Sequence, residues 1–110
     1  MKRVGKVSKY LNVKTRIGDK VFDSKKEASR YMLLRDMDRA LEIQYLRTQV
    51  PFPITINGKK ICTYIADFMY IKGEEQIIED VKSEITRKNP VYRLKKKLVE
   101  ALYNITITEV

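Results

Sequence analysis

The sequence contains no histidine and a single cysteine, Cys62. The absence of histidine excludes catalysis by a histidine general base and nucleases of the His–metal finger type. With no histidine and one cysteine, the chain cannot build a structural zinc site from the usual ligands. A bound metal would have to be held by Asp, Glu and carbonyl oxygens, which suit a hard cation such as Mg²⁺, with Mn²⁺ as a substitute.

Long apolar segments are also missing. No run approaches the roughly 18–20 residues that span a bilayer, and no apolar signal core follows the basic start at residues 1–3. The lone cysteine excludes an internal disulfide and fits a reducing compartment. We therefore expect a cytoplasmic protein without membrane contacts. At 110 residues, with 44% hydrophobic and 34% charged residues, the composition is that of one globular domain.

Positive charge is in excess and is unevenly distributed. The net charge is +9 with a pI near 9.7, and residues 1–18 and 85–99 carry basic residues without one acid. Two such blocks predict a polyanionic partner, although a basic surface without a ligand would have the same composition. The cations expected to contact DNA are Lys2, Arg3, Lys6, Lys9, Lys14, Arg16, Lys25, Lys26, Arg87, Lys88, Arg93, Lys96 and Lys97.

The pattern of turns and apolar residues predicts an α/β fold. We expect a mobile basic arm at residues 1–12 and one domain at 13–110, beginning with a short hairpin at 13–22. Ser24 should cap a helix that runs to about residue 41, and Asn89-Pro90 should open a second helix. Strands are expected on both sides of Asn57-Gly58, at 76–82 and at 105–110. The expected core faces of the two helices comprise Tyr31, Leu34, Met37 and Leu41, and Val91, Leu94, Leu98 and Leu102.

Two strands carry the residues with chemical potential. In the strand at 76–82, alternation places Asp80 and Lys82 on one face, with their charged ends close together. Asp67 lies alone in an apolar strand at 64–70, where an aspartate is disfavoured by both strand propensity and burial. If the two strands pair as a meander, Asp67 and Asp80 can share a cation while Lys82 orients water or neutralises charge on a phosphate. A surface ion pair would also explain Asp80 and Lys82.

Glu27 is the third acid of interest. It lies three residues after Ser24, so it could be the partner in a capping box. At 100° per residue, however, it shares the apolar side of the helix with Tyr31 and Leu34, where a carboxylate needs a partner. Asp38 lies at a similar angle but three turns away, near the helix end.

A glutamate on the first helix, Asp on a middle strand and D-x-K on the next strand resemble the PD-(D/E)xK nucleases. That superfamily includes restriction endonucleases and Holliday-junction resolvases. Within it, the chain from about residue 9 to 110 looks like one phage and prophage family formerly catalogued as of unknown function. The segments that carry this resemblance are 21–28, 46–49, 64–68, 79–82 and 92–98. Two positions depart from the family pattern, Ala66 in place of proline and Ser83 in place of glycine.

The resemblance implies a restriction-endonuclease-like core, a mixed sheet flanked by helices in the order α-β-β-β-α-β. It implies that Glu27, Asp67, Asp80 and the Val81 carbonyl bind Mg²⁺ and that Lys82 is the catalytic lysine. Gln49 matches a glutamine that lies near the active site in related nucleases, with a surface glutamine as the alternative. Lys95 is expected to contact the scissile phosphate. The alternative is that its side chain extends along the helix surface and ends in solvent without a ligand.

The implied activity is Mg²⁺-dependent hydrolysis of DNA phosphodiester bonds by an endonuclease, in the cytoplasm of an infected or lysogenic bacterium. A short chain has little room for a base-reading module, and phosphate contacts carry no sequence information, so we expect selection by DNA shape. A homodimer with two sites would suit a four-way junction in phage recombination or packaging. The alternatives are a nicking or double-strand endonuclease recruited by a partner, and a non-catalytic DNA-binding protein with the same fold.

Overall fold

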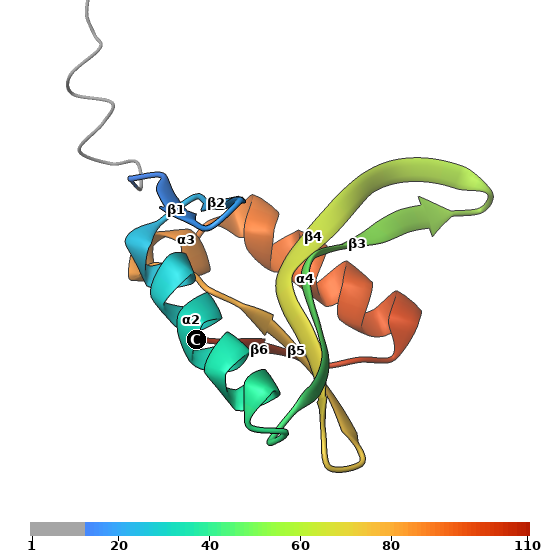
Figure 1. Cartoon of the computed structure of the whole chain (residues 1–110). Helices are drawn as coiled ribbons and strands as arrows, with labels where there is room; N and C mark the ends of the chain where they lie inside the picture. Colours follow the sequence, from blue (N-terminus) through green and yellow to red (C-terminus); the bar gives the residue numbers. More distant parts are fainter. Residues whose placement is uncertain (1–12) are drawn as a thin grey trace, which may run out of the picture.

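In the computed structural model, which describes residues 13–110, a four-stranded mixed sheet lies between two helices (Figure 1). Its strand order is β3-β4-β5-β6; only the β5–β6 pair is parallel. The predicted arm at 1–12, with Lys2, Arg3, Lys6 and Lys9, lies outside the described residues. The elements are β1 (Thr15–Ile17), β2 (Lys20–Phe22), α2 (Lys25–Arg39), β3 (Gln44–Ile56), β4 (Lys59–Lys72), β5 (Glu75–Asp80), α3 (Glu84–Arg87), α4 (Pro90–Tyr103) and β6 (Ile107–Glu109).

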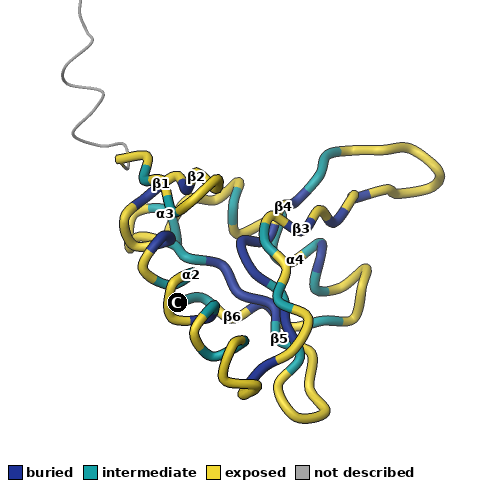
Figure 2. Tube along the Cα trace, viewed as in Figure 1, coloured by how far each residue is buried: buried dark blue, intermediate teal, exposed yellow. Residues whose placement is uncertain are grey.

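Each face of the sheet has its own apolar core, and the central strands are the most buried part of the chain (Figure 2). On one face Ala28 and Leu34 of α2 share a core with Phe68 and Tyr70 of β4, and on the other Val99 of α4 shares a core with residues from all four strands of the sheet. This arrangement confirms the predicted α/β class and is compatible with a restriction-endonuclease-like core. None of the helices within 13–110 is long and apolar enough to cross a membrane.

Local sequence rules account for where most elements begin and end. Ser24 Oγ accepts the backbone N–H of Glu27 at 3.0 Å, and the Asn89 side chain caps α4 ahead of Pro90. Asn57 and Gly58 both adopt positive φ and join β3 to β4 in the predicted hairpin. The prolines of β3 are tolerated because β3 is an edge strand of the sheet.

The predicted apolar faces of the helices are partly wrong. Leu41 is 81% exposed because α2 ends at Arg39 and Leu41 itself adopts φ 62°, which turns the chain away from the helix axis. On α4 the core contact is made by Val99 with Tyr92 and Leu98, whereas Val91, Leu94 and Leu102 are exposed. The side of α4 that carries Tyr92 faces the sheet, and the predicted side with Val91 and Leu94 faces away from it. Helix α3 was not predicted.

Candidate active site

Asp67 and Asp80 are brought together by the antiparallel pairing of β4 and β5. The register pairs Phe68 with Glu79, so Asp67 and Asp80 are opposite each other one step further along. The Asp67 backbone N–H donates to Asp80 Oδ1 at 3.3 Å, and the Val81 N–H donates to Asp67 Oδ2 at 2.8 Å. The predicted meander and the predicted approach of these two acids are therefore confirmed.

Both carboxylates are buried, and burial raises their pKa. Asp80 is fully buried and Asp67 is 8% exposed. Desolvation raises the pKa of Asp80 to about 6, against the opposing effect of the Lys82 ammonium. Desolvation also raises the pKa of Asp67, opposed by the hydrogen bond from Val81 and by Lys82. Because Asp80 has no exposed surface, the alternative of a surface ion pair with Lys82 does not describe this site.

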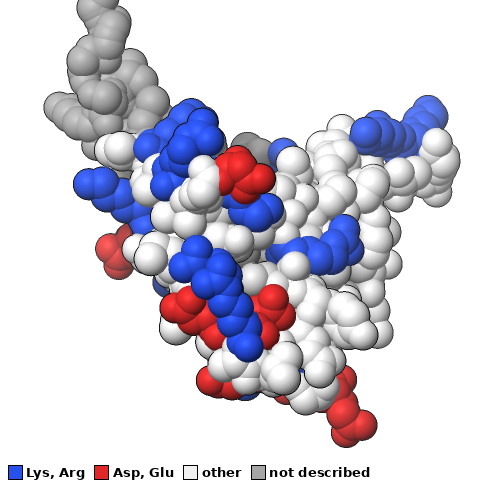
Figure 3. Space-filling model, viewed as in Figure 1, with Lys and Arg blue, Asp and Glu red and all other residues white. Residues whose placement is uncertain are grey.

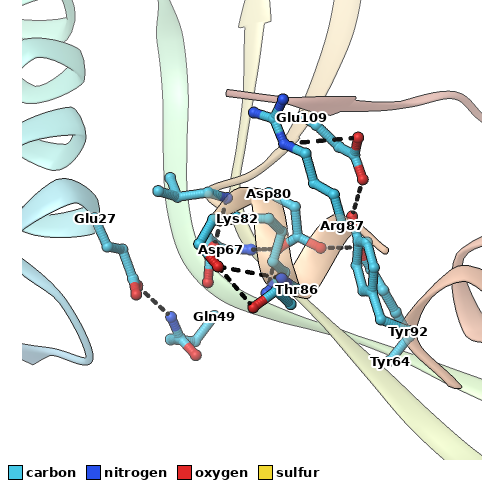
Figure 4. Close-up of polar contacts among 12 residues, drawn as sticks. Glu27, Gln49, Tyr64, Asp67, Asp80, Lys82, Thr86, Arg87, Tyr92 and Glu109 are labelled. Carbon is cyan, nitrogen blue, oxygen red and sulfur yellow. Dashed lines mark hydrogen bonds and ion pairs between the residues drawn. The ribbon is translucent and has the colours of Figure 1, made fainter. Parts of the chain in front are cut away.

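Lys82 points into the site as strand alternation predicted. Its Nζ lies 3.5 Å from Asp80 Oδ1 and 5.4 Å from the centre of the Tyr92 ring (Figure 4). The hydroxyl of Tyr64 donates to the other Asp80 oxygen. Ile78 packs on the α4 side of the sheet and Ile77 on the α2 side, which confirms the predicted alternation along β5.

The site lies where the long β3–β4 hairpin changes face. In β4, Ala66 packs in the α4-side core but Phe68 packs in the α2-side core, although two residues apart in a regular strand share a face. Opposite, Gln49 has φ 53° in β3, a left-handed conformation that interrupts side-chain alternation. Asp67 therefore lies between Ala66 and Phe68, where the side chains of β4 switch from one side of the sheet to the other. Its carboxylate can be approached by groups from both sides.

Glu27 approaches from α2 and is linked to the aspartates through Gln49. Gln49 Nε2 donates to Glu27 Oε2 at 3.0 Å, and hydrogen bonding from Gln49 also lowers the pKa of Asp67. Glu27 is only 5% exposed, and burial, followed by the charge of Asp67, raises its pKa to about 7. Its backbone N–H donates to the Ser24 side chain, but its carboxylate accepts from Gln49 and not from the Ser24 backbone, so the second bond of a capping box is not formed. Metal binding by Glu27 stays a prediction.

The carboxylates have the chemistry for a hard cation, but Glu27 does not converge with the other two. Within residues 13–110 no group of three or more Asp, Glu or Cys side chains is close enough together to hold a metal ion. The reason is the layering: Glu27 belongs to the α2 face, Asp80 bonds Tyr64 of the α4-side core, and Gln49 separates Glu27 from Asp67. Three buried acids face one ammonium, Lys82, and this charge imbalance fits a divalent cation bound by Asp67 and Asp80.

The predicted basic residues that the structure describes are distributed over several elements. Lys26 lies beside the site, because its Nζ donates to the Lys82 carbonyl at 3.2 Å. Lys14 pairs with Asp23 at 3.2 Å, and Lys95 is half-buried on α4 without a hydrogen bond or ion pair inside the described range. Its contact with a phosphate stays a prediction. Basic side chains gather over β1, β2 and α3, and both basic and acidic side chains cover α2 (Figure 3). The remaining basic residues are Arg16 on β1, Lys25 on α2, Arg87 on α3, Lys88 at its end, and Arg93, Lys96 and Lys97 on α4.

Sequence reasoning missed the supports of the site. Tyr64 and Tyr92 lie within motif segments but received no role, because a tyrosine in an apolar stretch is indistinguishable from a core residue. The buried Glu79 next to Asp80 accepts two bonds from Arg30, at 2.8 and 2.6 Å, and a third from Tyr70. An acid at 79 on the apolar face of a strand was the available signal for this ion pair.

Comparison with known proteins gives a family but no activity. The family model described as "Protein of unknown function (DUF1064)" matches residues 7–108. No curated protein and no solved structure matches the chain. The matched range covers nearly the whole chain and includes Glu27, Asp67, Asp80 and Lys82. The protein therefore belongs to the DUF1064 family.

Proposed function

We propose that this protein is a Mg²⁺-dependent DNA endonuclease of the PD-(D/E)xK type. The observation that carries the proposal is the convergence of Asp67, Asp80 and Lys82 at the point where β4 changes face, with both carboxylates buried. Burying two acids costs free energy unless they are paired or bind a cation, so such sites are typically functional. The DNA-binding part of the proposal is supported by the net charge of +9.

The chain's own residues have distinct roles in this proposal. Lys82, held between Asp80 and the Tyr92 ring, orients the attacking water or neutralises charge that develops on the phosphate. The Val81 N–H and the Asp67 N–H each fix one carboxylate, so neither side chain needs to reorganise during the reaction. Lys26, whose ammonium lies at the Lys82 carbonyl, binds a DNA phosphate at the entrance to the site.

Asp67 and Asp80, with the Val81 carbonyl, would hold the metal, and Glu27 would join after Gln49 releases it. Mg²⁺ supplies Lewis-acid polarisation of the phosphate and lowers the pKa of water, and Mn²⁺ would substitute. The donor set is entirely oxygen, in agreement with the absence of histidine from the sequence. Gln49 Nε2, which bonds Glu27 Oε2 and also lowers the pKa of Asp67, keeps the third acid in place while the metal is absent.

The proposed substrate is branched DNA, a four-way junction above all, cut by a homodimer in phage recombination or packaging. The helices and strands of residues 13–110 pack around one sheet and show no separate base-reading module, and phosphate contacts alone do not read sequence. Selection by DNA shape and by the spacing of two sites in a symmetric dimer meets this requirement.

A cleavage assay tests the proposal. A labelled four-way junction, a linear duplex and a single strand are each incubated with the protein in Mg²⁺ or in EDTA. We expect cleavage of the junction in Mg²⁺ only, loss of cleavage in Asp80→Asn, and normal cleavage in the exposed control Asp19→Asn. Equal cutting of the three substrates would contradict junction selectivity. Binding without Mg²⁺-dependent cutting of any substrate would leave a non-catalytic DNA-binding protein.

A further inference from the structure

A cavity separate from the carboxylate site lies between α3, α4 and β6. Its volume is about 370 Å³ and its lining is entirely charged, with four cations and two acids. The lining residues are Arg87, Arg93, Lys96, Lys97, Glu100 and Glu109. No apolar residue lines the cavity, and the excess of cations over acids in its lining favours an anion.

Both acids of the cavity are already engaged, whereas half of the cations are free. Lys96 lies 3.9 Å from Glu100, and Arg87 lies 3.9 Å from Glu109, which also accepts the Tyr92 hydroxyl at 2.6 Å. Arg93 and Lys97 form no ion pair within residues 13–110, and residues 1–12 contain no acid that could supply one. The buried Nε of Arg87 has no hydrogen-bond acceptor among the described atoms.

The unpaired donors fit a phosphate group. A guanidinium presents a planar fork of N–H donors that matches two phosphate oxygens, and a lysine adds a mobile point charge. An unpaired buried donor costs free energy that an anion in the cavity would recover. We propose that this cavity binds a non-scissile backbone phosphate of DNA through Arg87, Arg93 and Lys97. The assignment rests on DNA as the substrate class of the proposed function.

Tyr92 connects the cavity to the catalytic residues. Its hydroxyl bonds Glu109 at the cavity wall, and its ring faces the Lys82 ammonium at 5.4 Å (Figure 4). The side chain of Tyr92 thus contacts both the cavity and the carboxylate site. A DNA strand held by the cavity has a neighbouring part of its backbone at Asp80 and Lys82, so the cavity positions the scissile bond and does not take part in its hydrolysis.

The test is DNA binding in EDTA, where no cleavage occurs. Fluorescence anisotropy of a labelled duplex across a range of KCl concentrations compares the wild type, Arg93→Ala/Lys97→Ala and the control Lys59→Ala/Lys60→Ala. All four lysine and arginine side chains are exposed, so both variants should fold, and thermal melting checks this. We expect the slope of log Kd against log [KCl] to fall by about one in the cavity variant and to be unchanged in the control. From 50 to 200 mM KCl, one such contact corresponds to about 3.5-fold in affinity.

A second arm separates DNA phosphate from free phosphate. Part of the KCl is replaced by inorganic phosphate at constant ionic strength, which should weaken DNA binding by the wild type and the control but not by the cavity variant. An unchanged slope in the cavity variant, with phosphate still raising the Tm of the wild type, would assign the cavity to a free anion and overturn the proposal. An unchanged slope with no phosphate effect would also overturn it. Salt-dependent binding without cleavage in Mg²⁺ would instead contradict only the nuclease activity.

Discussion

Replacing Glu27 by glutamine should stabilise the protein at pH 8 in the absence of divalent metal. The pKa of Glu27 is raised from 4.5 to about 7 by burial and by the charge of Asp67. Between these two values the folded state binds a proton that the unfolded state has released, so the free energy of unfolding falls as the pH rises from about 4.5 to 7. Above pH 7 the full destabilisation by the Glu27 carboxylate is present.

The size of the effect follows from the two pKa values. At 1.36 kcal/mol for each pH unit, the difference between 4.5 and about 7 corresponds to about 3 kcal/mol. Glutamine has the same shape and still offers an oxygen to Gln49 Nε2, so the contact at 3.0 Å can be kept. We therefore expect Glu27→Gln to be roughly 2–3 kcal/mol more stable than the wild type at pH 8 and nearly equal to it at pH 4.5.

Urea denaturation in EDTA from pH 4.5 to 8.5 measures this difference directly. The control is Glu42→Gln, the same chemical change at an exposed position just after α2. A stability difference that is independent of pH, or a Glu27→Gln protein that is less stable at pH 8, would refute the reasoning. A Glu42→Gln profile that follows that of Glu27→Gln would show that net charge, and not the buried site, is responsible.

Four further outcomes follow from the site and its supports. Mg²⁺ should raise the Tm of the wild type at pH 8 but not that of Asp80→Asn; equal shifts in thermal melts would contradict metal binding at Asp80. At limiting Mg²⁺, cleavage rates should increase from pH 6 to 8, because metal binding requires deprotonated carboxylates whose pKa values are raised; a flat profile would contradict this. Arg30→Ala should cost about 3–5 kcal/mol in urea denaturation by leaving the buried Glu79 carboxylate without its cation, and the double variant with Glu79→Gln should cost less. Removing residues 1–12 should weaken DNA binding and flatten its salt dependence; an unchanged slope would exclude a role for these residues.

Sequence alone predicts those parts of the fold that short-range chemistry determines. Ser24, Asn57-Gly58 and Asn89-Pro90 act on their immediate neighbours, so the helix starts and the hairpin turn were correct. Helix α4 has two adjacent apolar sides, one with Val99 and one with Leu94, and periodicity cannot decide which of them meets the sheet. Only the packing of Tyr92 and Val99 against the sheet resolves that choice.

In the candidate site, too, short-range patterns were predictable and the packing of distant elements was not. Strand alternation predicted that Asp80 and Lys82 share a face, and the meander predicted that Asp67 lies opposite Asp80. The position of Glu27 relative to them could not be derived in this way. It depends on the change of face at Asp67 and on the positive φ of Gln49, and neither of these is marked by a turn residue in the sequence.

The parallel pairing of β6 with β5 has a consequence for the timing of assembly. Val110 N–H donates to the Asp80 carbonyl, and Lys82 N–H donates to the Val110 carbonyl, so the backbone around Asp80 is held by residues about thirty positions downstream. During synthesis the helices and the β3–β4 hairpin leave the ribosome before β6 does. A nascent chain without β6 can pair β5 with β4 but lacks the two backbone hydrogen bonds that hold the segment of Asp80 and Lys82.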